Sequence, residues 1–128
     1  HYVKGHEVQA NQAYQEAIKL TRKEMKENPE DASLISSLAL YLAKQGNYDP
    51  AFQKINQALK QAPEHLEILR ISIMVFELSG KRDRAILSLE EFMNRKGPTP
   101  ELIKSPFLVS FLSDPRAKTL LNVRTDSH

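Results

Sequence analysis

The sequence contains no cysteine and no tryptophan among its 128 residues. The absence of cysteine excludes disulfides, thiolate catalysis and cysteine-ligated metal sites, and it leaves the compartment undetermined: the cytoplasm is the default expectation and the periplasm stays open. No stretch is apolar for long enough to span a bilayer, so we expect no membrane insertion. Lysine and arginine total 18 and aspartate and glutamate 16, and the basic residues are scattered along the chain. Without a basic stripe, the sequence gives no electrostatic support for nucleic-acid binding.

The signatures of an active site are also missing. No glycine-rich phosphate loop, nucleophile elbow or converging acidic pair can be assembled from the sequence, so we expect neither enzymatic activity nor a cofactor. Ser105 and Ser113 are better explained as parts of helix starts before proline. Of the four histidines, two are terminal, and His6 and His65 share no predicted helix. No metal-ligand spacing results.

What the sequence does contain is self-similarity at a spacing of 34 residues, which is best settled before any local interpretation. Residues of like kind recur at this distance: Tyr14 with Tyr48, Ala17 with Ala51, Met25 with Leu59, Pro29 with Pro63, Gly46 with Gly80, and Ala51 with Ala85. The chain is therefore predicted to be built from repeats.

Residues 32–65 form the full copy of the repeat and predict two helices joined by a turn. Asp31 stands where an N-cap is expected, and Gly46 ends the first helix because glycine enters the left-handed conformation without a Cβ penalty. Pro50 suits the first turn of the second helix, and Pro63 ends that helix. Apolar residues recur three and four apart in both helices: Ile35, Leu38, Ala39, Leu42, Tyr48, Ala51, Phe52, Ile55, Ala58 and Leu59. The alanines in this set predict a close approach of the two helix backbones.

Residues 66–97 form a divergent copy. Ile73 stands where the preceding copy has Ala39, which predicts a slightly splayed helix pair, and Phe92 replaces Ala58. A large ring at this position would push away a closely stacked next helix. We therefore expect something other than a regular repeat beyond residue 96.

Residues 98–123 are predicted to form short helices that cap the stack. Each of three dipeptides places an N-cap residue before a proline at the first helical position: Thr99-Pro100, Ser105-Pro106 and Asp114-Pro115. Such caps cover the face that the last repeat would otherwise expose. Residues 124–128 are predicted to form a polar, frayed tail.

At the amino end, residues 6–29 are predicted to be the second helix of a partial repeat. Gly5 has two interpretations, either a position inside a truncated first helix or a turn before an extended helix, and we favour the turn because no breaker follows it. The chain starts at His1 without most of the preceding helix, so we expect a piece of a longer polypeptide. Apolar Val8, Tyr14 and Ile18 would need cover. This leaves a structural spacer, or weak self-association through this helix, as the alternative function.

The full copy resembles the tetratricopeptide repeat family, and the resemblance covers residues 14–95. The matching residues are Leu38, Ala39, Leu42, Gly46, Tyr48, Ala51, Ala58 and Pro63. The C-terminal segment is similar to the ends of many bacterial arrays of this family. The resemblance implies an all-α superhelix of antiparallel helix pairs that acts as a protein-interaction module, with a concave groove that holds a peptide or a partner helix.

The first helix of each pair lines the groove in such repeats. The resemblance implies that the groove is lined by Ser33, Ser36, Leu40, Lys44, Glu67, Arg70, Met74, Glu77 and Leu78. Helical periodicity independently places these residues on the side of each helix opposite the core-facing residues. We expect Leu40 and Met74 to supply apolar contact and the charged residues to set the register of the partner. The clamp for a partner's C-terminal carboxylate found in some members is not expected, because Glu67 would repel it.

Overall fold

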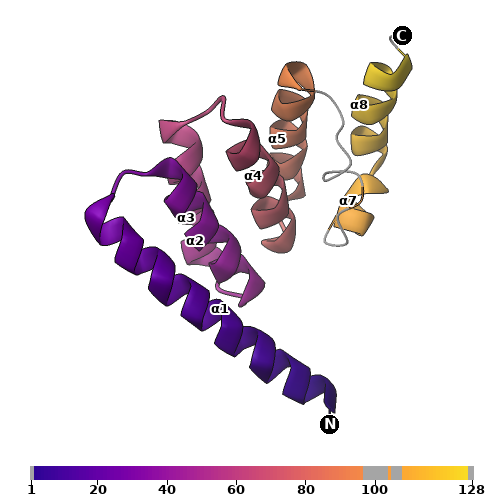
Figure 1. The fold of residues 1–128 in the computed structure, drawn as a ribbon. Coiled ribbons are helices and arrows are strands. Elements are labelled where there is room, and N and C mark those ends of the chain that lie inside the picture. The colour runs from indigo at the N-terminus through magenta and orange to yellow at the C-terminus, as the bar shows by residue number, and fades with distance from the viewer. Residues whose placement is uncertain (1, 97–103, 105–107, 127–128) are drawn as a thin grey trace.

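The computed structural model describes residues 2–96, 104 and 108–126, and no strand occurs among them. The helices follow one another across the molecule (Figure 1). Their bounds are α1 (Tyr2–Glu27), α2 (Ala32–Lys44), α3 (Tyr48–Gln61), α4 (Leu66–Leu78), α5 (Arg82–Arg95), α7 (Val109–Leu112) and α8 (Pro115–Asp126). From α1 to α5 consecutive helices run antiparallel, which confirms the predicted all-α fold of paired helices. In the described part, no helix combines the length and the apolar character needed to cross a membrane.

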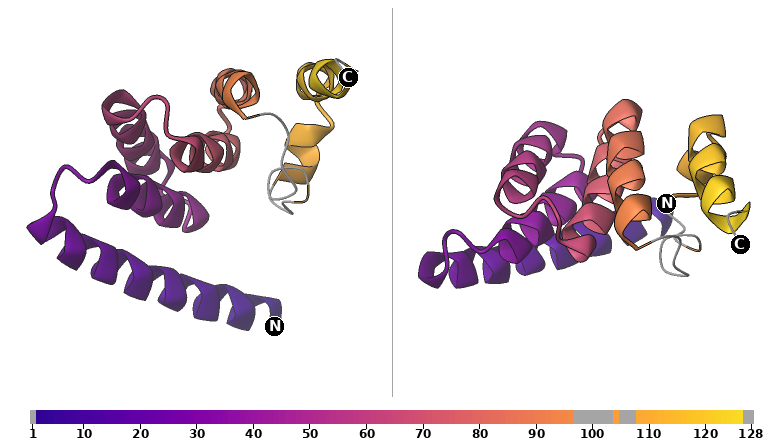
Figure 2. Two further views of the ribbon diagram at one scale, coloured as in Figure 1. Left: turned by 45° about the horizontal axis from the view of Figure 1, so that its top comes forward. Right: turned by 90° about the horizontal axis from the view of Figure 1, so that it is seen from above.

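The helices α2 and α4 occupy the centre of the stack. α2 packs against α1, α3 and α4, and α4 also packs against α3 and α5. The turned views in Figure 2 show α1 extending well past the end of α2. Because each pair buries its apolar face against the next, a core extends along the stack from Ile18 to Ala117, beside a smaller cluster of Ile35, Ala58 and Ile68.

Glycines make the turns inside both repeats, as the spacing predicts. Gly46 has φ +87° and Gly80 has φ +74°. After the first turn the N–H of Asn47 donates to the carbonyl of Leu42 at 2.9 Å, so the end of α2 leaves fewer unpaired carbonyls. A side chain at either glycine would force an L-residue into the left-handed region.

The first helix of each pair is capped by a side chain at its amino end. The Asp31 carboxylate accepts a hydrogen bond from the Leu34 N–H at 3.2 Å, as predicted. At the equivalent place in the next pair, Nδ1 of His65 accepts from the Ile68 N–H at 3.4 Å. Both bonds satisfy an N–H that has no partner within its own helix.

The three alanines that the sequence assigns to the contact between α2 and α3 are completely buried. Ala39, Ala51 and Ala58 all have no exposed surface, and Ile55 is buried beside them. Small side chains at a helix contact let the backbones approach closely. The burial of these alanines supports the predicted packing of α2 against α3.

The second pair uses different residues at its contact. Ile73 and Phe92 are buried where the first pair has alanines. The hydroxyl of Ser72 donates to the Leu69 carbonyl at 2.6 Å and lies 2.8 Å from the hydroxyl of Ser88, so two buried polar side chains satisfy one another between α4 and α5.

The amino-terminal helix is longer than predicted. Gly5 lies inside α1, so the preferred interpretation of Gly5 as a turn is wrong. Ile18 and Thr21 are buried against the core, whereas residues 9–13 are exposed. The buried half is the half that runs alongside α2.

Of the two C-terminal helices, α8 lies against α5 and α7 lies against α8. Leu108, Phe111 and Ala117 are completely buried, and α8 packs on α5. α8 begins at Pro115 and continues to Asp126, so residues 124–126 are helical rather than a frayed tail. The two predicted helix starts at Thr99-Pro100 and Ser105-Pro106 lie outside the described residues.

An ion-pair network ties the start of α8 to the start of α5. The guanidinium of Arg116 contacts Asp83 at 2.7 Å and Asp114 at 3.2 Å, and Arg82 lies 3.6 Å from Asp114. The hydrogen bonds from Arg116 hold the pKa of the Asp114 carboxyl below its usual value. Because the folded pKa is depressed, the contribution to stability is present at neutral pH and is lost as the pH falls through that lowered pKa.

Candidate functional site

The predicted groove residues come from one side of α2 and α4, and we call this surface the α2–α4 face. Its α2 half includes Ser33, which is exposed, and Ser36, which is buried. The hydroxyl of Ser36 donates to the carbonyl of Ser33 at 2.8 Å, so Ser36 is occupied within its own helix. Leu40 is half-buried against the core. Ser33 and part of Leu40 are therefore the accessible elements here.

Lys44 closes the α2 half of this face. Its ammonium lies 5.8 Å from the centre of the Tyr14 ring, so it links α2 to α1. Partial burial, and then the positive charge of Arg70, lower the pKa of Lys44. The two cations are thus near enough to influence one another across α2 and α4.

On the α4 half, Glu67, Arg70 and Met74 form one connected group. Arg70 Nε donates to a Glu67 carboxylate oxygen at 2.7 Å, and its Nη1 lies 3.6 Å from the Met74 sulfur. Met74 is only 6% exposed. Met74, which was expected to offer apolar contact to a partner, is therefore buried, and Arg70 lies against its sulfur.

Glu77 and Leu78 end the α4 half. The Glu77 carboxylate pairs with the guanidinium of Arg82 at the start of α5, and its side chain is 12% exposed. This hydrogen bond raises the pKa of Arg82. Glu77 therefore stabilises the turn between α4 and α5, while Leu78 is half-buried against the core.

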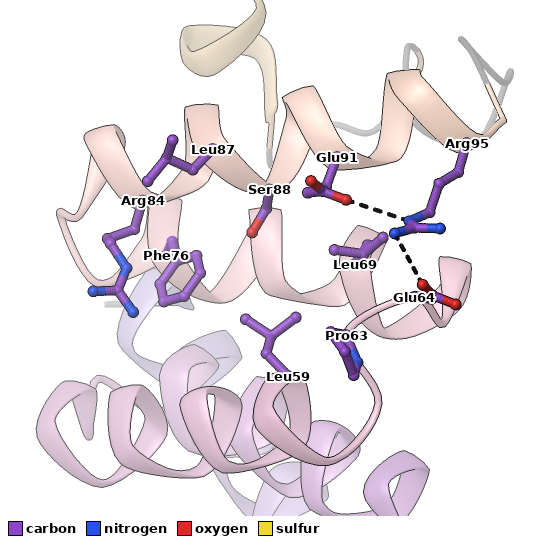
Figure 3. A pocket seen from close by; sticks show the side chains of 10 residues that line it. All are labelled: Leu59, Pro63, Glu64, Leu69, Phe76, Arg84, Leu87, Ser88, Glu91 and Arg95. Atoms are coloured by element: carbon purple, nitrogen blue, oxygen red, sulfur yellow. Dashed lines mark hydrogen bonds and ion pairs between the residues drawn. The ribbon is translucent and has the colours of Figure 1, made fainter.

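A second surface, absent from the sequence-based prediction, is a cleft of about 420 Å³ between α3 and α5, with α4 beneath it (Figure 3). We call it the α3–α5 cleft. Its apolar lining consists of Leu59, Pro63, Leu69, Phe76 and Leu87. Leu87 is 59% exposed, whereas Leu69 and Phe76 are buried beneath the opening. The cleft is therefore open to solvent: Leu69 and Phe76 form its buried apolar base, and Leu87 forms an apolar side that water reaches.

Side-chain bridges cross this cleft at two places. Arg84 on α5 donates to the Asn56 amide oxygen on α3 at 2.6 Å. Arg95, at the end of α5, lies 3.4 Å from Glu64, which follows α3, and 3.3 Å from Glu91 (Figure 3). Between the bridges, Ser88 leaves room because its side chain is small.

The sequence did carry a signal for this cleft. At the 34-residue spacing, Leu87 corresponds to Gln53 and Ser88 to Lys54. An apolar residue thus replaces a polar one on the outer face of the second helix, and a small residue replaces a long one. Neither change alters the helical periodicity, so the repeat pattern alone does not reveal either of them.

A further hollow, of about 750 Å³, lies along α1 and is lined in part by basic residues. Lys19, Arg22, Lys23 and Lys26 fall three and four apart, so they share one side of the helix, with Leu20 beside them. The description of the basic residues as scattered is therefore wrong for α1. Among the described residues, no group of three or more acidic or histidine side chains is arranged to hold a metal ion.

Taken together, the antiparallel pairs, the glycine turns and the alanine contacts define a tetratricopeptide-like helical repeat. A family model described as "Anaphase-promoting complex, cyclosome, subunit 3" (ANAPC3) matches residues 10–92 of the 128, and the chain belongs to this family. Searches of curated proteins and of solved structures gave no match. Tetratricopeptide-like repeats are scaffolds for protein interaction and are generally not catalytic, and this chain is a module of that class.

Proposed function

We propose that this module binds a peptide or a helix of a partner protein across the α2–α4 face. The observation that carries the proposal is the membership of the ANAPC3 family, because stacked repeats of this kind present the first helices of their pairs to partners. With two complete pairs the face is short, so we expect a contact below about 1,200 Å² and rapid exchange. Tethering or avidity would then strengthen the binding.

Within this face we assign the direct contacts to the accessible side chains. Ser33, Lys44 and Glu67 offer polar groups, and the exposed part of Leu40 offers an apolar one. Arg70 has a more specific role, because a partner carboxylate that draws it away from Glu67 would also uncover Met74. The methionine would then contact the partner, and its flexible thioether suits varied apolar side chains.

Peptide display tests this proposal because it selects ligands from a random library and needs no identified partner. Peptides selected on the wild-type chain are measured against Lys44→Glu and Arg70→Glu, with Lys60→Glu as a charge-matched control on exposed α3. We expect both face variants to lose binding by roughly fivefold or more, and the control to retain it. Selected peptides that bind all three variants as well as the wild type would place the binding site elsewhere.

The alternative is self-association through α1, where Leu20 is 60% exposed. The four cations around Leu20 oppose contact between two copies of this surface, because like charges would meet. Light scattering after size exclusion separates the alternatives. A monomer at high protein concentration removes the self-association alternative, and a dimer that Leu20→Glu dissociates supports it.

A further inference from the structure

The α3–α5 cleft has opposite charge at its two ends. At one end, Arg84 stacks with its guanidinium 5.3 Å from the centres of both the Phe52 and Phe76 rings, and the Lys81 ammonium lies 5.4 Å from Phe52. Within the part of the chain that the structure describes, neither cation is in an ion pair with a carboxylate. The only hydrogen bond that the described structure gives the Arg84 side chain goes to a neutral amide. This end has excess positive charge and a guanidinium already fixed in place.

The other end has excess negative charge. Glu64 and Glu91 share the single guanidinium of Arg95, and both carboxylates are largely exposed. One cation cannot neutralise two carboxylates, so this end favours an added basic group. Because α3 and α5 both run toward this end, their C-terminal carbonyls add to its negative potential.

The distance between the ends limits what fits. Arg84 and Arg95 are eleven residues apart on α5, which is about 16 Å along a helix axis. About five residues of extended chain cover that length. Between the ends, Leu59 and Leu87 offer accessible apolar surface above the buried Phe76.

We infer that the α3–α5 cleft is a second binding surface, which takes an extended segment of about five residues of a partner protein, with an acidic residue at one end, a basic residue at the other and leucine-like residues between them. The acidic side chain pairs with Arg84, where it competes with the weaker neutral acceptor Asn56. The basic side chain meets Glu64 and Glu91. The apolar side chains cover Leu87, which water otherwise reaches.

This surface is separate from the α2–α4 face. The cleft lies between the second helices of the two pairs, whereas the α2–α4 face belongs to the first helices. One chain could therefore hold two partner segments at once. Failure of either proposal leaves the other standing, because the two share no side chain.

The test uses three synthetic peptides and NMR chemical shifts of the full chain. Since the cleft does not fix chain direction, the probes are acetyl-Glu-Leu-Ala-Leu-Lys-amide and its reverse, with acetyl-Gln-Leu-Ala-Leu-Gln-amide as the neutral control. We expect one charged peptide to shift the amides of Leu59, Leu87 and Ser88 and to bind roughly three- to tenfold more tightly than the neutral peptide. Binding should weaken as salt is added.

Variants assign the binding to the two ends. Arg84→Gln should weaken the charged peptide roughly threefold, and Glu64→Gln combined with Glu91→Gln should weaken it similarly, with the neutral peptide unaffected. Arg22→Gln on α1 is the matched control for the arginine change, and denaturation midpoints check that each variant folds. Equal binding of charged and neutral peptides, or shifts confined to α2 and α4, would overturn the inference. So would shifts that grow with protein concentration alone, which would make a second copy of the chain the occupant, or the absence of shifts at millimolar peptide.

Discussion

The pairs α2–α3 and α4–α5 share one frame but fill it differently. Gly46 and Gly80 both make their turns with a positive φ, and Ala51 and Ala85 are both completely buried at the helix contact. Yet the first pair closes its contact with two further alanines, whereas the second uses Ile73 and Phe92. Backbone path and side-chain filling are thus set by different residues.

The comparison extends to the outer surface. In the second pair Ser88 stands where the first pair has Lys54: its buried hydroxyl pairs with Ser72, and its short side chain leaves space between α5 and α3. That space becomes the α3–α5 cleft. A repeat can therefore keep its helix positions while one short side chain opens a new surface.

The largest difference in stability between the two pairs should come from removing the buried ring of Phe92 in the second pair. Phe92→Ala should lower the free energy of unfolding by about 3–5 kcal/mol, because removal of the buried ring leaves a cavity that the neighbouring side chains cannot fully close. Chemical denaturation followed by circular dichroism measures this. A loss below about 1 kcal/mol would mean that the ring is not packed as described.

The reciprocal change in the first pair should be the next most costly. Ala58→Phe inserts a ring into a contact built from alanine, and we expect a loss of about 1–3 kcal/mol from overpacking. Ala58→Ser, which adds little volume, serves as the comparison. If the phenylalanine is tolerated as well as the serine, then α2 and α3 are not held as close as the buried alanines indicate.

The two turns should respond alike, which tests the shared frame. Gly46→Ala and Gly80→Ala should each cost about 1–2 kcal/mol. No atom lies within 4 Å of the added Cβ at either position, so the cost is conformational rather than steric. Thermal melts of both variants measure it. Clearly unequal losses would argue against equivalent turns.

The buried serine pair should show coupling that the first pair lacks. Ser72→Ala leaves the Ser88 hydroxyl without its buried partner and should cost about 1 kcal/mol, and adding Ser88→Ala should cost little more. A double-mutant cycle by urea denaturation measures the coupling. Strict additivity would show that the two hydroxyls do not interact.

The smallest effect is expected at the caps. Asp31→Ala should cost about 0.5–1 kcal/mol, and His65→Ala less, because the His65 bond is longer. Asp31→Asn, which keeps an oxygen acceptor, should retain most of the stability. If Asn and Ala at this position lose the same amount, the side-chain bond to Leu34 contributes nothing.

The sequence predicted the repeat and the two large core residues that set the second copy apart, but not the contacts of individual surface side chains. The spacing of Gly46, Ala51 and Pro63 was enough to predict paired helices, because glycine turns and alanine contacts follow from local chemistry. The burial of Met74 and the pairing of Glu77 with Arg82 could not be read the same way, since each depends on a neighbour at the level of single side chains. Gly5 was misjudged because helix propensity is weak evidence against a continuing helix.

Because α1 is longer than α2, the rate of amide hydrogen exchange should differ between the two halves of α1. α1 has 26 residues and α2 has 13, so residues 10–13 of α1 form backbone bonds without tertiary support, whereas Ile18 and Thr21 are anchored. A helix without such support opens readily in water. Hydrogen exchange should therefore be fastest near the amino end of α1 and become much slower near Ile18. A partner that binds the unsupported half of α1 would slow exchange there, so exchange along this helix would detect such binding.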